Sequence, residues 1–220
     1  MALTAKAAGG TDYTPIEAGV HLAVCYGVYD LGTHHDDIYD KDQHKIVILW
    51  EVPDSRIEIE RDGIRKDLPR AISSRYTLSL GEKARLRKDL ESWRGRPFTA
   101  QELEGFDLRN ILGKSCQLNI VHNVSKDGAK TFANIAAIMG LPKGVHPLSL
   151  ENEMQWYSME EGQSIPETTP EWIRTLIGKS NEVVAANQTH GAPPEVASPG
   201  EHAYTPADEP PDYTDDIIPF

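Results

Sequence analysis

The chain has 220 residues, 34 of them acidic and 22 basic, so its formal net charge is −12. Such a charge excludes a protein that binds nucleic acid through a uniformly basic surface, but the charge is uneven along the chain. Residues 61–130 hold 15 Lys and Arg against 9 Asp and Glu, whereas residues 181–220 hold eight acids and no base. No window approaches the ~18–20 apolar residues of a membrane span, so we expect a soluble, cytoplasmic protein.

The first 80 residues follow the patterns of a β protein. Residues 1–17 indicate a flexible N-terminus. Apolar side chains alternate from Val20, which predicts a strand with Tyr29 on the outward face. The patterns predict strands over 20–29, 44–52 and 71–80, a polar loop over 30–43, and a small hairpin over 56–68 around Arg61-Asp62-Gly63. The cysteines, Cys25 and Cys116, lie singly in apolar runs and are expected to be reduced core residues.

One helix separates these strands from two more. An apolar stripe at Ala84, Leu86, Leu90 and Trp93 predicts a helix that Gly95 ends, and Thr99 with Glu102 forms a capping box for a short turn. Two further strands are expected over 113–124 and 130–139. Three strands, a helix and two strands is the order of the oligonucleotide/oligosaccharide-binding (OB) barrel, a small closed Greek-key barrel. We therefore predict a mainly β protein with a five-stranded OB-type barrel over residues 18–142.

The remainder of the chain is expected to be an appendage and a tail. Thr169 as N-cap, Pro170 as first helical residue and Gly178 as stop predict a short helix within an appendage over 143–180. Residues 181–211 are Pro-, Ala- and acid-containing and predict a disordered linker.

The last nine residues form an acidic tip with an apolar end. A partner with a small apolar pocket rimmed by Lys and Arg fits the terminal Phe ring, the α-carboxylate and the acids together. The candidate partner-binding residues are Asp212, Asp215, Asp216, Ile217, Ile218, Pro219 and Phe220. The alternative is a frayed acidic terminus with no role. The order Asp-Asp-Ile-Ile-Pro-Phe closely resembles the tip of bacterial-type single-stranded DNA-binding proteins. That resemblance implies recruitment of replication and repair enzymes such as a polymerase, helicase, primase or nuclease.

A second resemblance covers about residues 20–140. It rests on Asp30-Leu31-Gly32-Thr33, Leu49-Trp50-Glu51, SSRYTLSL from Ser73, LRKDLESWRGRPF from Leu86, Gly105-Phe106-Asp107-Leu108 and LGKSC from Leu112. These segments resemble a group of phage-encoded single-stranded DNA-binding proteins. The resemblance implies an OB-fold protein that coats and protects single-stranded DNA during phage replication and recombination, in the host cytoplasm. The Trp-Arg-Gly-Arg segment is absent from the usual bacterial proteins, so their tetrameric assembly is not carried over, and a homo-oligomer stays an open alternative.

Single-strand binding needs cations for phosphates and aromatic faces for bases. In the third strand we expect Arg75 outside and Tyr76 inside, and we expect Trp93 and Phe106 in the core. The candidate nucleic-acid-binding residues are Tyr29, Trp50, Arg61, Arg65, Lys66, Arg70, Arg75, Arg94, Arg96, Lys114, Lys126 and Lys130. The acids of the tail are a candidate competitor for the same basic groove.

The sequence predicts no cofactor, no metal and no catalytic residue. His34-His35-Asp36-Asp37 reads as a polar loop, because adjacent residues of an extended segment point apart and no third ligand stands at helical spacing. Two rival function classes stay open. One is a protein-interaction module whose tip mimics that of a host single-stranded DNA-binding protein. The other is a Mg²⁺-dependent nuclease using Asp30, Asp36 and Asp37.

Overall fold

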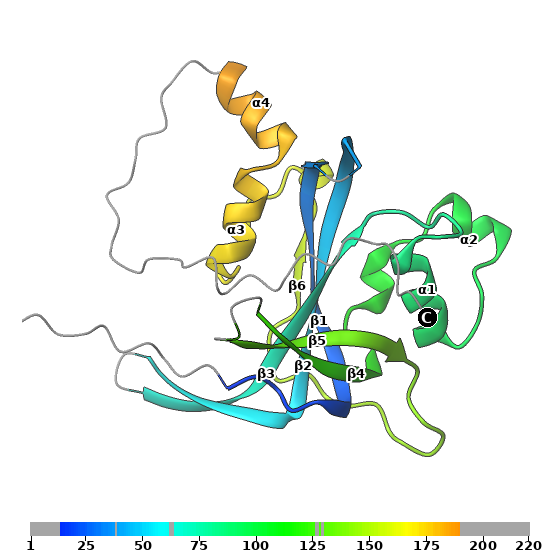
Figure 1. Cartoon of the computed structure of the whole chain (residues 1–220), viewed down its shortest axis with the longest axis vertical. Helices are drawn as coiled ribbons and strands as arrows, with labels where there is room; N and C mark the ends of the chain where they lie inside the picture. The colour runs from blue at the N-terminus through cyan, green and yellow to red at the C-terminus, as the bar shows by residue number, and fades with distance from the viewer. Residues whose placement is uncertain (1–13, 38, 62–63, 126–127, 129, 190–220) are drawn as a thin grey trace, which may run out of the picture.

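The computed structural model describes residues 14–37, 39–61, 64–125, 128 and 130–189 (Figure 1). In chain order the elements are β1 (Gly19–Asp36), β2 (Lys41–Arg61), β3 (Ile64–Thr77), α1 (Arg85–Arg94), α2 (Ala100–Glu104), the 3-10 helix η1 (Leu108–Ile111), β4 (Ser115–Val124), β5 (Thr131–Met139), β6 (Gln155–Tyr157), the 3-10 helix η2 (Met159–Glu161), α3 (Glu171–Gly178) and α4 (Asn181–Thr189). Within this described part of the chain, no helix is long and apolar enough to cross a membrane.

Five strands form one curled antiparallel sheet in the order β3-β2-β1-β4-β5. The long strand β1 produces the curl, because Gly19 to Val24 pair with β4 whereas Val24 to Asp36 pair with β2. Irregularities in the β1–β2 register between Cys25 and Gly27 and between Asp30 and Gly32 add to the bend. The edge strands β3 and β5 approach each other without hydrogen-bonded pairing. The prediction of a mainly β protein is therefore confirmed, and the predicted helix α1 lies between β3 and β4, followed there by the short helices α2 and η1.

The concave side of the sheet encloses the main hydrophobic core. Alternate residues of the strands point inward, and α1 adds Leu86, Leu90 and Trp93. Trp50 lies at the centre with no exposed surface, and its ring centroid is 6.0 Å from that of Trp93. Helix α1 ends where expected, at Gly95 with φ of 68°. The buried thiols of Cys25 and Cys116 both point into this core, and burial raises the pKa of each far above its usual value.

A second core lies on the outer face of β1 and β2. Strand β6 pairs in parallel with β1 at Gly27–Tyr29, and α3 packs beside it (Figure 1). The buried side chains of this second core are Tyr29, Leu31, Val47, Leu49, Tyr157, Ile173 and Ile177. The segment predicted as an appendage therefore completes the burial of two strands of the curled sheet, β1 and β2.

Two buried carboxylates fasten the appendage to the sheet. Glu51 is fully buried and accepts hydrogen bonds from the backbone N–H of Glu151 (2.8 Å) and from Asn152 through its N–H (2.9 Å) and Nδ2 (2.7 Å). Asp30 accepts from the backbone N–H of Gly32 (2.9 Å) and of Met159 (3.1 Å), and its Oδ1 lies 2.6 Å from His44 Nε2. Each acid therefore binds the backbone of a segment that lies about 100 residues or more later in the chain.

Several boundaries differ from the sequence prediction. The loop expected over 30–43 is wrong, because β1 continues to Asp36 and β2 begins at Lys41. The polar residues that suggested a loop are accommodated in this hairpin by hydrogen bonds, such as the one from the Gly32 N–H to Asp30. The flexible N-terminus does not extend to residue 17, because Ile16 is 3% exposed and belongs to the main core.

The appendage is also longer than expected. The linker predicted from residue 181 begins instead with α4, which contacts β1: Glu182 accepts hydrogen bonds from the N–H (2.9 Å) and the hydroxyl (2.6 Å) of Thr33. Thr169 is not the N-cap of α3; Pro170 occupies that position, and α3 runs through Gly178. The remaining linker and the whole acidic tip lie outside the described residues.

Candidate nucleic-acid interface

Neither predicted stacking aromatic is accessible. Tyr29 was expected to point outward, but its ring is 1% exposed and lies between β1 and α3 in the second core. Trp50 has no exposed surface and lies in the main core. Alternation misassigned Tyr29 for two reasons. The bulge between Cys25 and Gly27 shifts the alternation of β1, so that Cys25 and Val28 lie in the main core whereas Tyr29 faces the second core, and both faces are buried. A base cannot stack on either ring in this fold.

The other face assignments in this region are confirmed. Tyr76 is 2% exposed and belongs to the main core, whereas Arg75 is only partly buried on the opposite face of β3. Trp93 is a core residue, and Phe106 packs against that core from its edge. The ring of Phe106 meets that of Phe98 edge-on, with centroids 5.1 Å apart.

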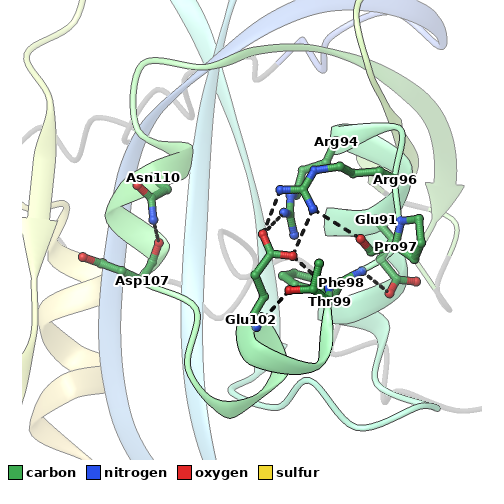
Figure 2. Close-up of polar contacts among 9 residues, drawn as sticks. All are labelled: Glu91, Arg94, Arg96, Pro97, Phe98, Thr99, Glu102, Asp107 and Asn110. Carbon is green, nitrogen blue, oxygen red and sulfur yellow. Dashed lines mark hydrogen bonds and ion pairs between the residues drawn. The ribbon is translucent and has the colours of Figure 1, made fainter.

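Arg94 and Arg96 converge on Glu102, between α1 and α2 (Figure 2). Glu102 Oε1 pairs with Arg94, and its carboxylate accepts from Arg96 at 2.8 and 3.0 Å. Glu102 also completes the predicted capping box: its Oε2 accepts from the Thr99 N–H at 2.9 Å, and its own N–H donates to Thr99 Oγ1 at 3.2 Å. The bonds from Arg96 and Thr99 hold the pKa of Glu102 well below its usual range.

Both arginines were predicted to bind nucleic acid, but in the structure both pair with Glu102. The side chain of Arg94 is only 15% exposed and stacks over Phe98, 4.4 Å from its ring centroid. Arg94 therefore has a structural role that its sequence position did not reveal. Arg96 keeps 54% of its side chain exposed but shares the same carboxylate.

Arg70 is also used inside the fold. Its Nε donates to the backbone carbonyl of Arg56 at 3.0 Å, and its Nη1 donates to that of Thr14. Together with the bond between His122 Nε2 and the Ile16 carbonyl (2.7 Å), this contact ties the N-terminal segment to β3 and β4. Arg70 thus joins the N-terminal segment to the base of the β2–β3 hairpin.

The remaining predicted cations lie at strand ends. Arg65 and Lys66 are exposed on the β2–β3 hairpin, and Lys114 and Lys130 are exposed just before β4 and β5. Lys66, Lys114 and Lys130 form no ion pair within the described part of the chain. The side chain of Arg61 and the whole of Lys126 lie outside the described residues.

Arg65 and Lys66 lie on the same side of the molecule as Lys130 (Figure 1). The end that β2 shares with β3 and the end that β4 shares with β5 both point away from α1 and α2 (Figure 1), and β3 and β5 approach each other at the edges of the sheet. We call Arg65, Lys66 and Lys130 the hairpin cations. Lys66 and Lys130 can contact phosphates without giving up an ion pair to a described residue, whereas Arg65 already makes an interaction within the fold.

The β1–β2 turn has the opposite character. Tyr39 at this turn is 38% exposed, and Lys41 Nζ lies 5.0 Å from its ring centroid, a pair that the sequence analysis missed. Four aspartates surround the turn, at positions 36, 37, 40 and 42. Their charge repels phosphate, so the exposed ring alone does not make the turn a nucleic-acid contact.

The polar segment at this turn shows no metal site. His35 Nδ1 lies 3.1 Å from Asp42 Oδ1, and the hydrogen bond to Asp42 raises the pKa of His35. No group of three metal-ligating side chains occurs among the residues that the structure describes. Of the three acids considered for a nuclease, Asp30 is engaged by His44 and two backbone amides, whereas the side chain of Asp37 is 99% exposed.

Comparison with known proteins identifies no relative. Searches among protein-family models, curated proteins and solved structures found no significant match to this chain.

Proposed function

We propose that the chain is a sequence-nonspecific single-stranded DNA-binding protein built on an OB-type barrel. The observation that carries this proposal is the strand order β3-β2-β1-β4-β5, with β3 close to β5 and α1 between β3 and β4. OB folds bind oligonucleotides on the face of their second and third strands and on the loops after the first and fourth strands. Arg75 lies on β3 and Lys130 precedes β5, which fits this mode of binding, whereas the loop after the first strand is the acidic β1–β2 turn.

The appendage restricts where DNA can lie. It covers the outer face of β2 at Val47 and Leu49 and leaves the outer face of β3, with Ser73, Arg75 and Thr77, only partly buried. Phosphates of the bound DNA would then contact the hairpin cations and would not contact the acids of the β1–β2 turn. Binding of this kind is largely electrostatic. For each phosphate contacted, the logarithm of the binding constant should therefore fall by about 0.7 when the salt concentration rises tenfold.

The test is a fluorescence titration with oligo-dT at two salt concentrations, using the intrinsic Trp and Tyr signal. We expect saturable binding that weakens with salt. Lys66→Glu and Lys130→Glu should each weaken binding about three- to tenfold and make the salt slope shallower by about 0.7 or more. Lys88→Glu is the matched control, because Lys88 is exposed on α1 and makes no ion pair with a described residue. A folded wild-type protein that shows no response at low salt would refute the proposal.

The tip carries the second half of the proposal. Residues 212–220 would recruit replication and repair enzymes, and the tail acids would compete with DNA for the hairpin cations. Deleting these residues should abolish enzyme recruitment and strengthen oligo-dT binding at low salt. Unchanged affinity would remove the competition. Tail-dependent enzyme binding by a protein without affinity for oligo-dT would mean that the chain is an interaction module whose tip is a mimic.

A further inference from the structure

The outer face of β4 and β5 is free of charge. The outward positions of β4 hold Gln117, Asn119, Val121 and Asn123, and opposite them on β5 stand Phe132 and Asn134. Asn123 pairs with Phe132 and Val121 with Asn134 across the two strands. We call these six residues the amide face. The other outward positions of the two strands are also uncharged, in a chain with 34 acids and a net charge of −12.

The amide face lies outside both hydrophobic cores and is partly buried. Its six side chains are all partly exposed, and none belongs to either hydrophobic core. The carboxamides of Gln117, Asn119 and Asn123 make no hydrogen bond to a described residue, and that of Asn134 reaches only the neighbouring Phe132 carbonyl at 3.5 Å. The outer face of β1 and β2, by contrast, is buried under α3 and β6.

The chemistry of this face suits nucleobases. A carboxamide both donates and accepts hydrogen bonds, so it can match the edge of any base, and an aromatic ring can stack on any base. Alternate residues of an antiparallel strand lie about 6.8 Å apart, so the carboxamides form a regular row. No carboxylate stands on the face to repel a polyanion, and exposed lysines lie at both ends of β4–β5: Lys114 before β4 and Lys130 before β5.

We propose that the amide face receives the bases of single-stranded DNA, with Phe132 as the stacking platform and the row of carboxamides contacting base edges. This inference rests on the proposed function and assigns its base-contacting surface, whereas the hairpin cations contact only phosphates. It predicts a preference for single strands, because base faces are stacked against each other in a duplex. A second copy of the chain is the competing occupant, since the cores of protein interfaces are also depleted in charge.

The experiment compares oligo-dT with an abasic oligonucleotide of equal length and charge. Wild type should bind oligo-dT more tightly. Phe132→Ala should weaken oligo-dT binding about five- to 100-fold and leave abasic binding unchanged. Tyr39→Ala is the matched control, because it removes an exposed ring at the acidic β1–β2 turn and should change neither affinity. Asn119→Asp should weaken oligo-dT binding several-fold, whereas Gln101→Glu, which adds the same charge on α2, should not.

The outcomes separate this inference from the proposed function. A wild type that binds neither oligonucleotide refutes the proposed function, and this inference with it. A wild type that binds both equally, or a Phe132→Ala protein with unchanged oligo-dT affinity, refutes only the amide face. If Asn119→Asp dissociates a dimer in sedimentation and leaves DNA affinity intact, the face is an interface between copies.

A crosslinking experiment on the wild-type protein tests the same surface without a substitution that could prevent folding. Photocrosslinking to an oligonucleotide containing 5-iododeoxyuridine, followed by trypsin digestion, should label the peptide over 131–143, which contains Phe132. Labelling confined to other peptides would overturn the assignment.

Discussion

The replacement Glu51→Gln tests how the appendage is attached to the curled sheet. Glu51 is fully buried on β2, and its two carboxylate oxygens accept three hydrogen bonds from Glu151 and Asn152 at 2.7–2.9 Å. Glutamine has the same shape but only one accepting oxygen, and its NH₂ would face an N–H donor. The change therefore removes at least one charge-assisted bond and leaves a buried donor without an acceptor.

The structure sets the size of the effect. A hydrogen bond to a charged group contributes about 1.5–3 kcal/mol, and an unsatisfied buried donor costs about 1–3 kcal/mol. We expect Glu51→Gln to lower the free energy of unfolding by about 2–4 kcal/mol. At about 2–4 °C per kcal/mol for a chain of this size, Tm falls by about 5–15 °C.

Thermal unfolding followed by circular dichroism measures this shift. Glu58→Gln is the control, because Glu58 is exposed on the same strand and the chemical change is identical. The control should change stability by no more than about 0.5 kcal/mol. Equal Tm values for the two variants would refute the assignment of Glu51 as the anchor of the appendage.

Three further predictions concern the frame of the candidate interface. Gly32→Ala should lower Tm more than Gly162→Ala: both glycines have positive φ, but at Gly32 a Cβ would lie 2.6 Å from a side-chain carbon of the appendage, whereas at Gly162 the space is open. The pKa of Glu102 is lower in the folded protein than its unfolded value of about 4.3. The ionised Glu102 carboxylate therefore stabilises the fold fully above about pH 4.3, and this stabilisation is lost as the pH falls toward the folded pKa. The Tm difference between wild type and Glu102→Gln should shrink from pH 7 to pH 3. A protein of residues 1–142 should aggregate, because it exposes the second core, whereas residues 1–189 should keep the Tm of the full chain by calorimetry.

Much of the local structure follows from the sequence because its signals are local. Period-two alternation located the cores of β1 to β5, the apolar stripe with Gly95 located α1, and Thr99 with Glu102 located the capping box of α2. Face assignment on β3 was correct for Tyr76 and Arg75, because that strand is buried on one side only. The succession of three strands, a helix and two strands was available for the same reason, whereas the pairing of β1 with β4 in the sheet was not.

Contacts between segments distant in sequence decided the rest. Tyr29 is buried because α3, some 140 residues later, covers the outer face of β1, and no pattern within β1 records that partner. Arg94 is held by Glu102, and Asp30 and Glu51 by the backbone of the appendage, so residues that resemble surface charges are structural. The amide face could not be recognised from the sequence, because only the pairing register of β4 with β5 places Phe132 beside Asn123. Alternation states which residues share a face only as far as the next bulge, as Cys25 and Tyr29 show. Whether a face meets water or another part of the chain is a property of the assembled fold.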